Sequence, residues 1–310
     1  MDPYFQFDVI SNILRYLNKD DSFNLINISK IMMPMRKLLY GKYLFDHFKC
    51  QECNHIKHIK TTTLYKTNNY NNLLSLVIIN KVFNESLDDL PSTLQSLTIT
   101  SSLFNKSLDL LPQSLATLKL IKCHSFNQQL LCLPIKLSKL SIHNETYNKK
   151  LDNLPQNLIK LTLKSSVFNH LLNKLPDSLI ALKLELVDFN QTIDALPKSL
   201  QKLKLSCYTF NGMLNNLPED LEILILQNFT TFNNSLDYLP LSLKKLKIIN
   251  CHSFNQPIDY LPSTLKSLQF NCYSDFNQTF DCLPESLTSL KIGFNAYNFP
   301  IDNLPESLEI

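Results

Sequence analysis

The sequence predicts a repeat solenoid, an arc of short parallel β-strands that follows a small all-α segment at the amino terminus. Three observations lead to this prediction. An aromatic residue followed by asparagine recurs every 21 or 22 residues, a Leu-Pro pair follows each aromatic residue at a constant distance, and each unit then ends in an alternation of leucine with other residues. Internal repeats with a period of this length are typical of solenoids.

Composition excludes several other classes of protein. The chain has only three glycines, whereas average usage in a chain this long gives about 22. Dinucleotide folds and phosphate-binding loops need clustered glycines, so both are excluded. The net charge of +3 does not by itself indicate a nucleic-acid or membrane partner. Neither a long apolar run nor a signal peptide is found, and we expect a soluble, cytoplasmic protein.

The repeating unit reads Phe-Asn-x-x-[Ile/Leu]-Asp-x-Leu-Pro-x-Ser-Leu-x-x-Leu-x-[Leu/Ile], and eleven copies occupy residues 83–310. Its Leu-x-Leu end alternates with period two, which predicts a short strand with one buried face. Proline cannot donate a backbone hydrogen bond, so the Leu-Pro pair belongs to the turn before the strand. One unit cannot bury its leucines alone, whereas a stack of units buries a continuous core. The eleventh unit stops at Ile310, before its strand is complete.

The asparagine of each unit is expected to form a structural ladder along the stack. It lies between an aromatic and an aliphatic position, where we expect its side chain to be buried and its amide to bond backbone groups of neighbouring turns. The alternative is a solvated turn asparagine, which does not explain why aspartate and serine never replace it. The expected ladder comprises Asn84, Asn105, Asn127, Asn148, Asn169, Asn190, Asn211, Asn233, Asn255, Asn277 and Asn298.

The unit resembles the FNIP repeat, a relative of the leucine-rich repeat found mainly in amoebal proteins and in the large DNA viruses that infect amoebae. The resemblance rests on Phe-Asn-x-x-[Ile/Leu]-x-x-Leu-Pro, in eleven copies over residues 83–310. It implies a leucine-rich-repeat-like arc that carries its parallel strands on the concave face and binds protein there. For a viral protein the expected compartment is the host cytoplasm.

Residues 1–48 differ from the repeats and predict a small helical segment, because apolar residues recur at helical spacing around a polar break. The stretch from Phe5 to about Met33 resembles an F-box, although Phe5-Gln6 stands where Leu-Pro is usual. An F-box docks on the Skp-type adaptor of a cullin-RING (SCF-type) ubiquitin ligase. The residues that the resemblance assigns to this face are Val9, Ile10, Ile13, Leu14 and Leu17. The alternative is a helical cap on the first turn of the solenoid.

Residues 49–82 are interpreted as a linker and a capping strand. Cys50 and Cys53 lie near several histidines, an arrangement that can hold zinc. The residues are too closely spaced to complete a tetrahedron and no second pair follows nearby, so we expect free thiols, no metal and no cofactor. The capping strand is expected at Leu73-x-x-Leu76-x-Ile78. The later cysteines are expected to be reduced, small, buried or half-buried thiols.

Lysines gather on one expected surface of the solenoid. The strand residues that alternate with the buried leucines point out from the concave face, and ten are lysines whereas only Glu185 is acidic. This predicts a positive field suited to an acidic or phosphorylated target protein. The alternative is that the lysines only maintain solubility. The lysines expected to bind the partner are Lys119, Lys139, Lys160, Lys183, Lys202, Lys204, Lys245 and Lys247, with Lys164 and Lys291 in the same columns.

Other functions are not indicated. Nucleic acid is not expected, because no aromatic column stacks bases and arginine is nearly absent. His124 and His252 each precede a serine, but a catalytic serine needs an oriented base and an oxyanion site, for which duplicated repeat positions are poor places. We expect a non-catalytic adaptor of a cullin-RING ligase whose solenoid recruits a target. The alternative is an interaction scaffold whose helices serve only as a cap.

Overall fold

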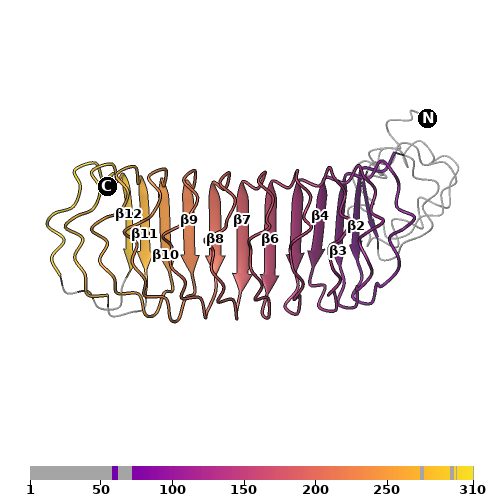
Figure 1. Ribbon diagram of the computed structural model, residues 1–310, viewed down its shortest axis with the longest axis horizontal. Helices are drawn as coiled ribbons and strands as arrows, with labels where there is room; N and C mark the ends of the chain where they lie inside the picture. The colour runs from indigo at the N-terminus through magenta and orange to yellow at the C-terminus, as the bar shows by residue number, and fades with distance from the viewer. Residues whose placement is uncertain (1–57, 62–71, 273–275, 294–296, 298, 310) are drawn as a thin grey trace, which may run out of the picture.

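The computed structural model describes residues 58–61, 72–272, 276–293, 297 and 299–309, which form a curved solenoid of parallel strands (Figure 1). Twelve strands pair in chain order, so each strand hydrogen-bonds the strands of the turns before and after it. The expected solenoid of short parallel strands is confirmed. The strands are β1 (His58–Thr61), β2 (Ser75–Ile79), β3 (Ser96–Thr100), β4 (Thr117–Ile121), β5 (Lys139–His143), β6 (Lys160–Ser165), β7 (Ala181–Leu186), β8 (Lys202–Ser206), β9 (Ile223–Gln227), β10 (Lys245–Ile249), β11 (Ser267–Asn271) and β12 (Ser289–Gly293).

The strands pair in the register of the repeat. Leu97 in β3 lies opposite Leu118 in β4, and Ile99 lies opposite Leu120. Because successive side chains of a strand point to opposite faces, this register puts every leucine of the motif on the same side of the sheet. In strands β2 to β11 the second and fourth residues are buried, and the residues between them are half-buried or exposed.

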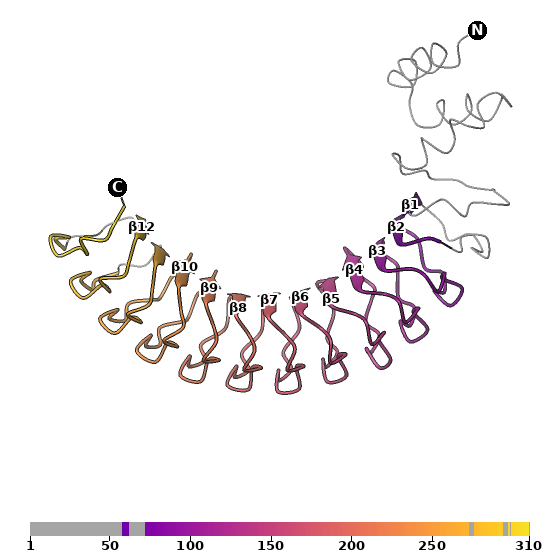
Figure 2. The ribbon, with the colours of Figure 1, turned by 90° about the horizontal axis from the view of Figure 1, so that it is seen from above.

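The sheet lines the inner side of the arc, and the turns that connect successive strands lie on its outer side (Figure 2). The core fills the space between the strands and these turns, where leucines from both parts of each unit pack together. The side chains that alternate with the core leucines therefore face the hollow of the arc.

The aromatic residues of the motif form a column through this core. Rings from consecutive turns stack nearly parallel, with centroids 5.9 Å apart between Phe83 and Phe104 and again between Phe104 and Phe126. Phe126 and Tyr147 continue the column with the same separation. Each ring completes the burial of the ring before it, so no single unit can form the core by itself.

The Leu-Pro pair makes the turn that leads into the strand. In most units the proline carbonyl accepts a hydrogen bond from the backbone N–H of the leucine three residues later, as Pro91 does from Leu94 at 3.0 Å and Pro112 from Leu115 at 3.0 Å. Proline fixes its own φ and has no N–H, so it suits a position where the ladder needs no donor.

Units of 21 and 22 residues fit the same register because the extra residue takes a left-handed conformation just after the strand. Lys122, Asn228 and Asn250 have φ values of 53°, 61° and 54°, and each lies in a 22-residue interval between successive aromatic residues. Left-handed backbone shortens the path of the chain locally and absorbs one residue without shifting the aromatic column.

Strand β1 lies in the segment interpreted as a linker; it pairs with the capping strand β2, His58 opposite Ser75, although no repeat motif marks it. The expected F-box-like segment, Cys50, Cys53 and Asn298 lie outside the described residues.

Tyr147 is the one buried polar group that the aromatic column leaves unpaired among the described residues. Its ring is fully buried, and its hydroxyl has no hydrogen-bond partner. Burial raises the pKa of this hydroxyl above its ordinary value. We expect Tyr147→Phe to increase the free energy of unfolding by about 1–2 kcal/mol, because the substitution removes a desolvated, unsatisfied group. Urea unfolding followed by circular dichroism measures the change.

Tyr297→Phe is the matched control for this substitution. The Tyr297 hydroxyl donates to the carbonyl of Gln278 at 3.1 Å, so removing it brings no gain in stability. A change in the free energy of unfolding of Tyr147→Phe that is no more favourable than that of Tyr297→Phe would contradict the prediction.

Candidate protein-binding face

We call the outward side chains at the first, third and fifth positions of strands β2 to β12 the concave face. Among the lysines expected there, Lys139, Lys160, Lys202 and Lys245 occupy the first position of their strands. The third position holds Lys119, Lys183, Lys204, Lys247 and Lys291, and the fifth holds Lys164. The sheet register aligns these positions in three rows that run along the arc.

Glu185 neutralises part of this positive charge. It pairs with Lys183 on its own strand at 2.7 Å and with Lys204 on the next strand at 3.9 Å. Partial burial disfavours the carboxylate, but the hydrogen bond and charge of Lys183 and the charge of Lys204 outweigh burial and lower the pKa of Glu185. These pairs are solvent-exposed, and we attribute little stability to them.

Most lysines of the face have no carboxylate partner among the described residues. Neither Lys202, Lys245 nor Lys247 pairs with a carboxylate of the described residues. Partial burial, followed by repulsion from Lys245 and Lys291, lowers the pKa of Lys247. An anion placed beside Lys247 relieves this repulsion, so this part of the face favours a negatively charged ligand.

Sequence reasoning missed an apolar feature of the same face. Ile223 and Ile225 are the first and third residues of β9, and both side chains point outward and are half-buried. The Leu-x-Leu pattern identifies only the buried positions of each strand and gives no information on the residues between them. The signal was present, since Ile-Leu-Ile-Leu replaces the usual alternation of polar and apolar residues.

The asparagine ladder lies on the surface of the turns, and the expected burial of its side chains is wrong. Asn84 and Asn105 are exposed, and so are most of their counterparts. In seven of the described intervals the amide oxygen accepts a hydrogen bond from the backbone N–H of the corresponding asparagine one turn later, as between Asn84 and Asn105 at 2.9 Å. The same bond links Asn105 to Asn127, Asn127 to Asn148, Asn169 to Asn190, Asn211 to Asn233, Asn233 to Asn255 and Asn255 to Asn277.

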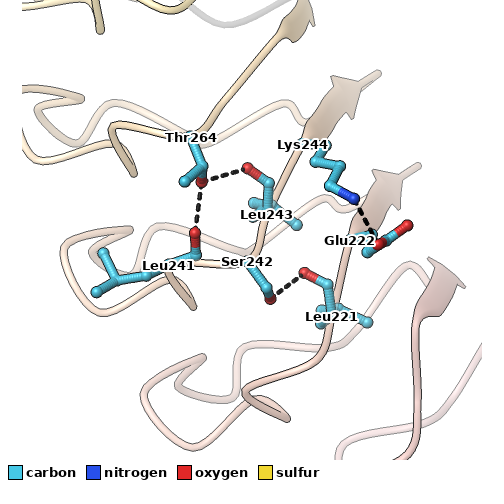
Figure 3. A network of polar contacts seen from close by, with 7 residues as sticks. All are labelled: Leu221, Glu222, Leu241, Ser242, Leu243, Lys244 and Thr264. Atoms are coloured by element: carbon cyan, nitrogen blue, oxygen red, sulfur yellow. Dashed lines mark hydrogen bonds and ion pairs between the residues drawn. The ribbon is translucent and has the colours of Figure 1, made fainter.

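A second ladder uses the serine of the Pro-x-Ser-Leu turn, for which the sequence suggested no role. Figure 3 shows Ser242 donating to the carbonyl of Leu221 at 2.9 Å, and Thr264 donating to the carbonyl of Leu243 at 3.0 Å. Hydroxyls at this position make the same bond in other turns, from Ser114 to Leu94 and from Ser178 to Leu158 among others. Each hydroxyl satisfies a backbone carbonyl of the preceding turn that the strand ladder does not reach.

A polar hollow of about 620 Å³ lies beside this second ladder. Its walls include Gln201, Glu222, Lys244 and Lys266, and Glu222 pairs with Lys244 at 2.6 Å (Figure 3). Ser242, Thr264 and Ser286 in its walls already donate to backbone carbonyls of the preceding turns. The polar groups of the hollow therefore serve the fold.

Small buried donors hold the turn at the end of several strands. Ser101 donates to the carbonyl of Phe83 and Ser165 to the carbonyl of Tyr147, both at 2.7 Å. Cys207 occupies the corresponding position and donates through sulfur to the carbonyl of Phe189 at 3.2 Å. This buried thiol therefore makes the hydrogen bond that serine makes in the other two turns.

The described cysteines are free, and they divide into two groups. Cys132 and Cys282 are exposed, whereas Cys123, Cys207, Cys251 and Cys272 are buried. Burial raises the pKa of Cys123 to about 11, so this thiol is protonated and unreactive at neutral pH. Within the described part of the chain, no three His, Cys, Asp or Glu side chains gather as ligands for a metal ion.

The part of the chain that the structure describes contains no helix of the length and apolar character needed to cross a bilayer.

Comparison with known proteins supports an FNIP- and leucine-rich-repeat-like repeat protein. Residues 254–295 match the family model described as FNIP Repeat. The solved structure of CroV588, a circular leucine-rich-repeat (LRR) protein, is 28% identical with a TM-score of 0.63 over 86% of this chain and 44% of that one. The chain thus spans less than half the length of CroV588.

Two bacterial proteins share less sequence with the chain. An internalin (InlF) of Listeria monocytogenes str. 4b F2365 is 16% identical with a TM-score of 0.58, over 92% of this chain and 91% of that one, which shows the fold alone. YopM from Yersinia enterocolitica WA-314 is 20% identical with a TM-score of 0.44, over 81% of this chain and 62% of that one. No curated protein matches the chain.

We expect alkylation to distinguish the two groups of cysteines. Cys132 and Cys282 should react rapidly with N-ethylmaleimide at neutral pH, whereas the four buried thiols should react only after unfolding, because they are shielded and Cys123 is protonated. Peptide mapping by mass spectrometry, with a urea-treated sample as the control, measures each site. Labelling of Cys123 as fast as that of Cys132 would show that the core opens readily.

Proposed function

We propose that this protein is a non-catalytic interaction protein that holds an acidic or phosphorylated target on its concave face. The observation that carries the proposal is the charge of that face, on which ten outward strand positions are lysines and one, Glu185, is acidic. Solenoids with this architecture are suited to protein–protein interaction, because a continuous sheet presents an extended surface. A positive surface speeds the encounter with an acidic partner and disfavours basic ones.

We further propose that the protein is the substrate-recruiting adaptor of a cullin-RING ubiquitin ligase and acts in the cytoplasm. The support is the resemblance of the segment from Phe5 to about Met33 to an F-box, on the same chain as a protein-binding solenoid. Val9, Ile10, Ile13, Leu14 and Leu17 would form the apolar surface that binds the Skp-type adaptor. The alternative is a scaffold without a ubiquitin link, whose amino-terminal segment only caps the solenoid.

Reversing the charge of the face tests the first proposal. A variant with Lys183→Glu, Lys202→Glu, Lys204→Glu and Lys247→Glu should lose most partner capture, with at least about a tenfold drop in yield, because the field changes sign. Its melting temperature should change little, because these side chains point toward solvent. Proximity labelling in cells, followed by quantitative mass spectrometry, identifies and counts the partners.

The matched control changes four exposed lysines of the turns, Lys106→Glu, Lys136→Glu, Lys150→Glu and Lys198→Glu. It alters the net charge by the same amount and leaves the concave face intact. Equal partner capture by wild type and the first variant would show that the lysines of the face only maintain solubility.

The ubiquitin link is tested separately with the full chain. We expect wild type to capture a purified Skp-type adaptor, and Ile10→Asp with Leu14→Asp to abolish capture, because a charge in an apolar docking surface is not compensated. Lys19→Ala, in the polar break of the same segment and outside the residues that the resemblance assigns, is the control. Failure of wild type to bind the adaptor would favour the scaffold alternative and leave the proposal for the concave face standing.

A further inference from the structure

At the first and third strand positions of the concave face, the isoleucines of β9 interrupt a mostly polar surface. The fifth position carries three further outward isoleucines, Ile79, Ile121 and Ile249, none of which has a lysine on the paired strands. At the first and third positions of strands β2 to β12 the residues are mostly serine, threonine, lysine or glutamine, and the remaining apolar ones are Val77 and Ala181. Strand β9 carries two large aliphatic side chains, Ile223 and Ile225, and both are half-buried. We call this pair the apolar strip.

Lysines flank the apolar strip on both sides. In the sheet register, Ile223 lies between Lys202 of β8 and Lys245 of β10, and Ile225 lies between Lys204 and Lys247. Neighbouring strands are about 4.8 Å apart, so each lysine lies one strand from the isoleucine that it flanks. The result is an aliphatic centre with two flexible cations on each side.

The charges around the strip are mostly uncompensated. Glu185 lies 3.9 Å from Lys204, which is the only ion pair that a described carboxylate makes with these four lysines. On the β10 side, partial burial and then repulsion from Lys245 and from Lys291 of β12 lower the pKa of Lys247. A ligand that fits this place combines an apolar group at its centre with negative groups on both sides.

We propose, resting on the protein-binding function above, that the partner presents an acidic segment in extended conformation, with an aliphatic side chain seated on the apolar strip. The segment crosses the strands, and the carboxylates two residues before and after the aliphatic residue bind the flanking lysines. In an extended chain, residues two apart point to the same side and are about 6.6 Å apart. Lysine side chains are long and flexible enough to bridge the small difference between this spacing and that of the strands.

The lysine stems could also cover the isoleucines by themselves, since their methylene groups pack readily on apolar surface. In that arrangement the strip is structural, and an aliphatic ligand gains nothing from it. A binding experiment with defined peptides separates the two arrangements.

The probe is a labelled peptide of sequence Ser-Glu-Ser-Glu-Ser-Leu-Ser-Glu-Ser-Glu-Ser, and its binding to the full-length protein is measured by fluorescence anisotropy at low salt. The first control peptide has serine in place of leucine. In the second, the leucine and the serine that follows it exchange places, which gives Ser-Glu-Ser-Glu-Ser-Ser-Leu-Glu-Ser-Glu-Ser. In an extended chain this leucine points to the side opposite the carboxylates. We expect the probe to bind at least about tenfold more tightly than either control, because burying one leucine side chain is worth that factor or more.

Protein variants locate the site. Ile223→Thr with Ile225→Thr should remove the preference for the leucine peptide, and threonine keeps the fold because it occupies the third position in β3 and β6. The matched control is Ile121→Thr, at the outward fifth position of β4, whose paired neighbours Thr100 and His143 are not lysines. Lys245→Gln with Lys247→Gln should weaken the binding of all three acidic peptides. Lys106→Gln with Lys136→Gln, in the turns, should leave their binding unchanged.

Equal binding of the leucine and serine peptides, absence of binding by the leucine peptide, or an unchanged preference in the threonine variant would overturn the inference. Binding of an oligouridylate that depends on the lysines and not on the isoleucines, with no preference for the leucine peptide, would also overturn it. None of these results bears on capture of cellular partners by the charged face, so the proposed function is judged by its own experiment.

Discussion

Each turn of this protein is stable because it rests on the turn before it. The strand hydrogen bonds, the stacked aromatic rings, the asparagine ladder and the serine ladder all connect one unit to its neighbour, and none of them closes within a unit. A constant register is therefore the constraint on which the rest of the structure depends. Loss of register by one residue would turn the leucines outward and separate the aromatic rings at the same time.

The chemistry of the two ladders explains which residues the motif uses. An exposed side chain on this turn must carry an acceptor that reaches the next turn, and the asparagine amide does so at 2.9 Å from Asn84 to the N–H of Asn105. Aspartate offers the same oxygen, but a column of carboxylates at the spacing of the turns would repel along its whole length. Serine is too short to span the turns from this position. It suits the Pro-x-Ser-Leu turn, where the carbonyl of the preceding turn lies close to its hydroxyl, as for Ser178 and Leu158.

The sequence predicts this fold well wherever the same position recurs in every unit. The buried leucines, the aromatic column and the outward orientation of the strand lysines all follow from periods of two and of 21 or 22 residues. The prediction that the asparagine side chains are buried is wrong. The apolar residues on either side of each asparagine in the sequence do not indicate whether its amide forms hydrogen bonds inside the core or at its surface. Strand β1 carries no motif, and it is placed by pairing with β2 instead.

Features that occur in only one or a few units do not appear as a period, although they distinguish one solenoid from another. The left-handed Lys122, the donor role of Cys207 and the outward Ile225 are all departures from the motif. The first two satisfy demands of the backbone, since one absorbs an extra residue and the other pairs a buried carbonyl.

The isoleucines of β9 meet no such demand. Their backbone pairs in the same register as every other strand, and the core beneath them is complete with Leu224 and Leu226, both fully buried. The repeat fixes the inward side chains and leaves the outward ones free to vary without loss of the core. Specific recognition therefore has to come from the outward positions, and on this face the contrast between aliphatic and cationic neighbours is sharpest at β9.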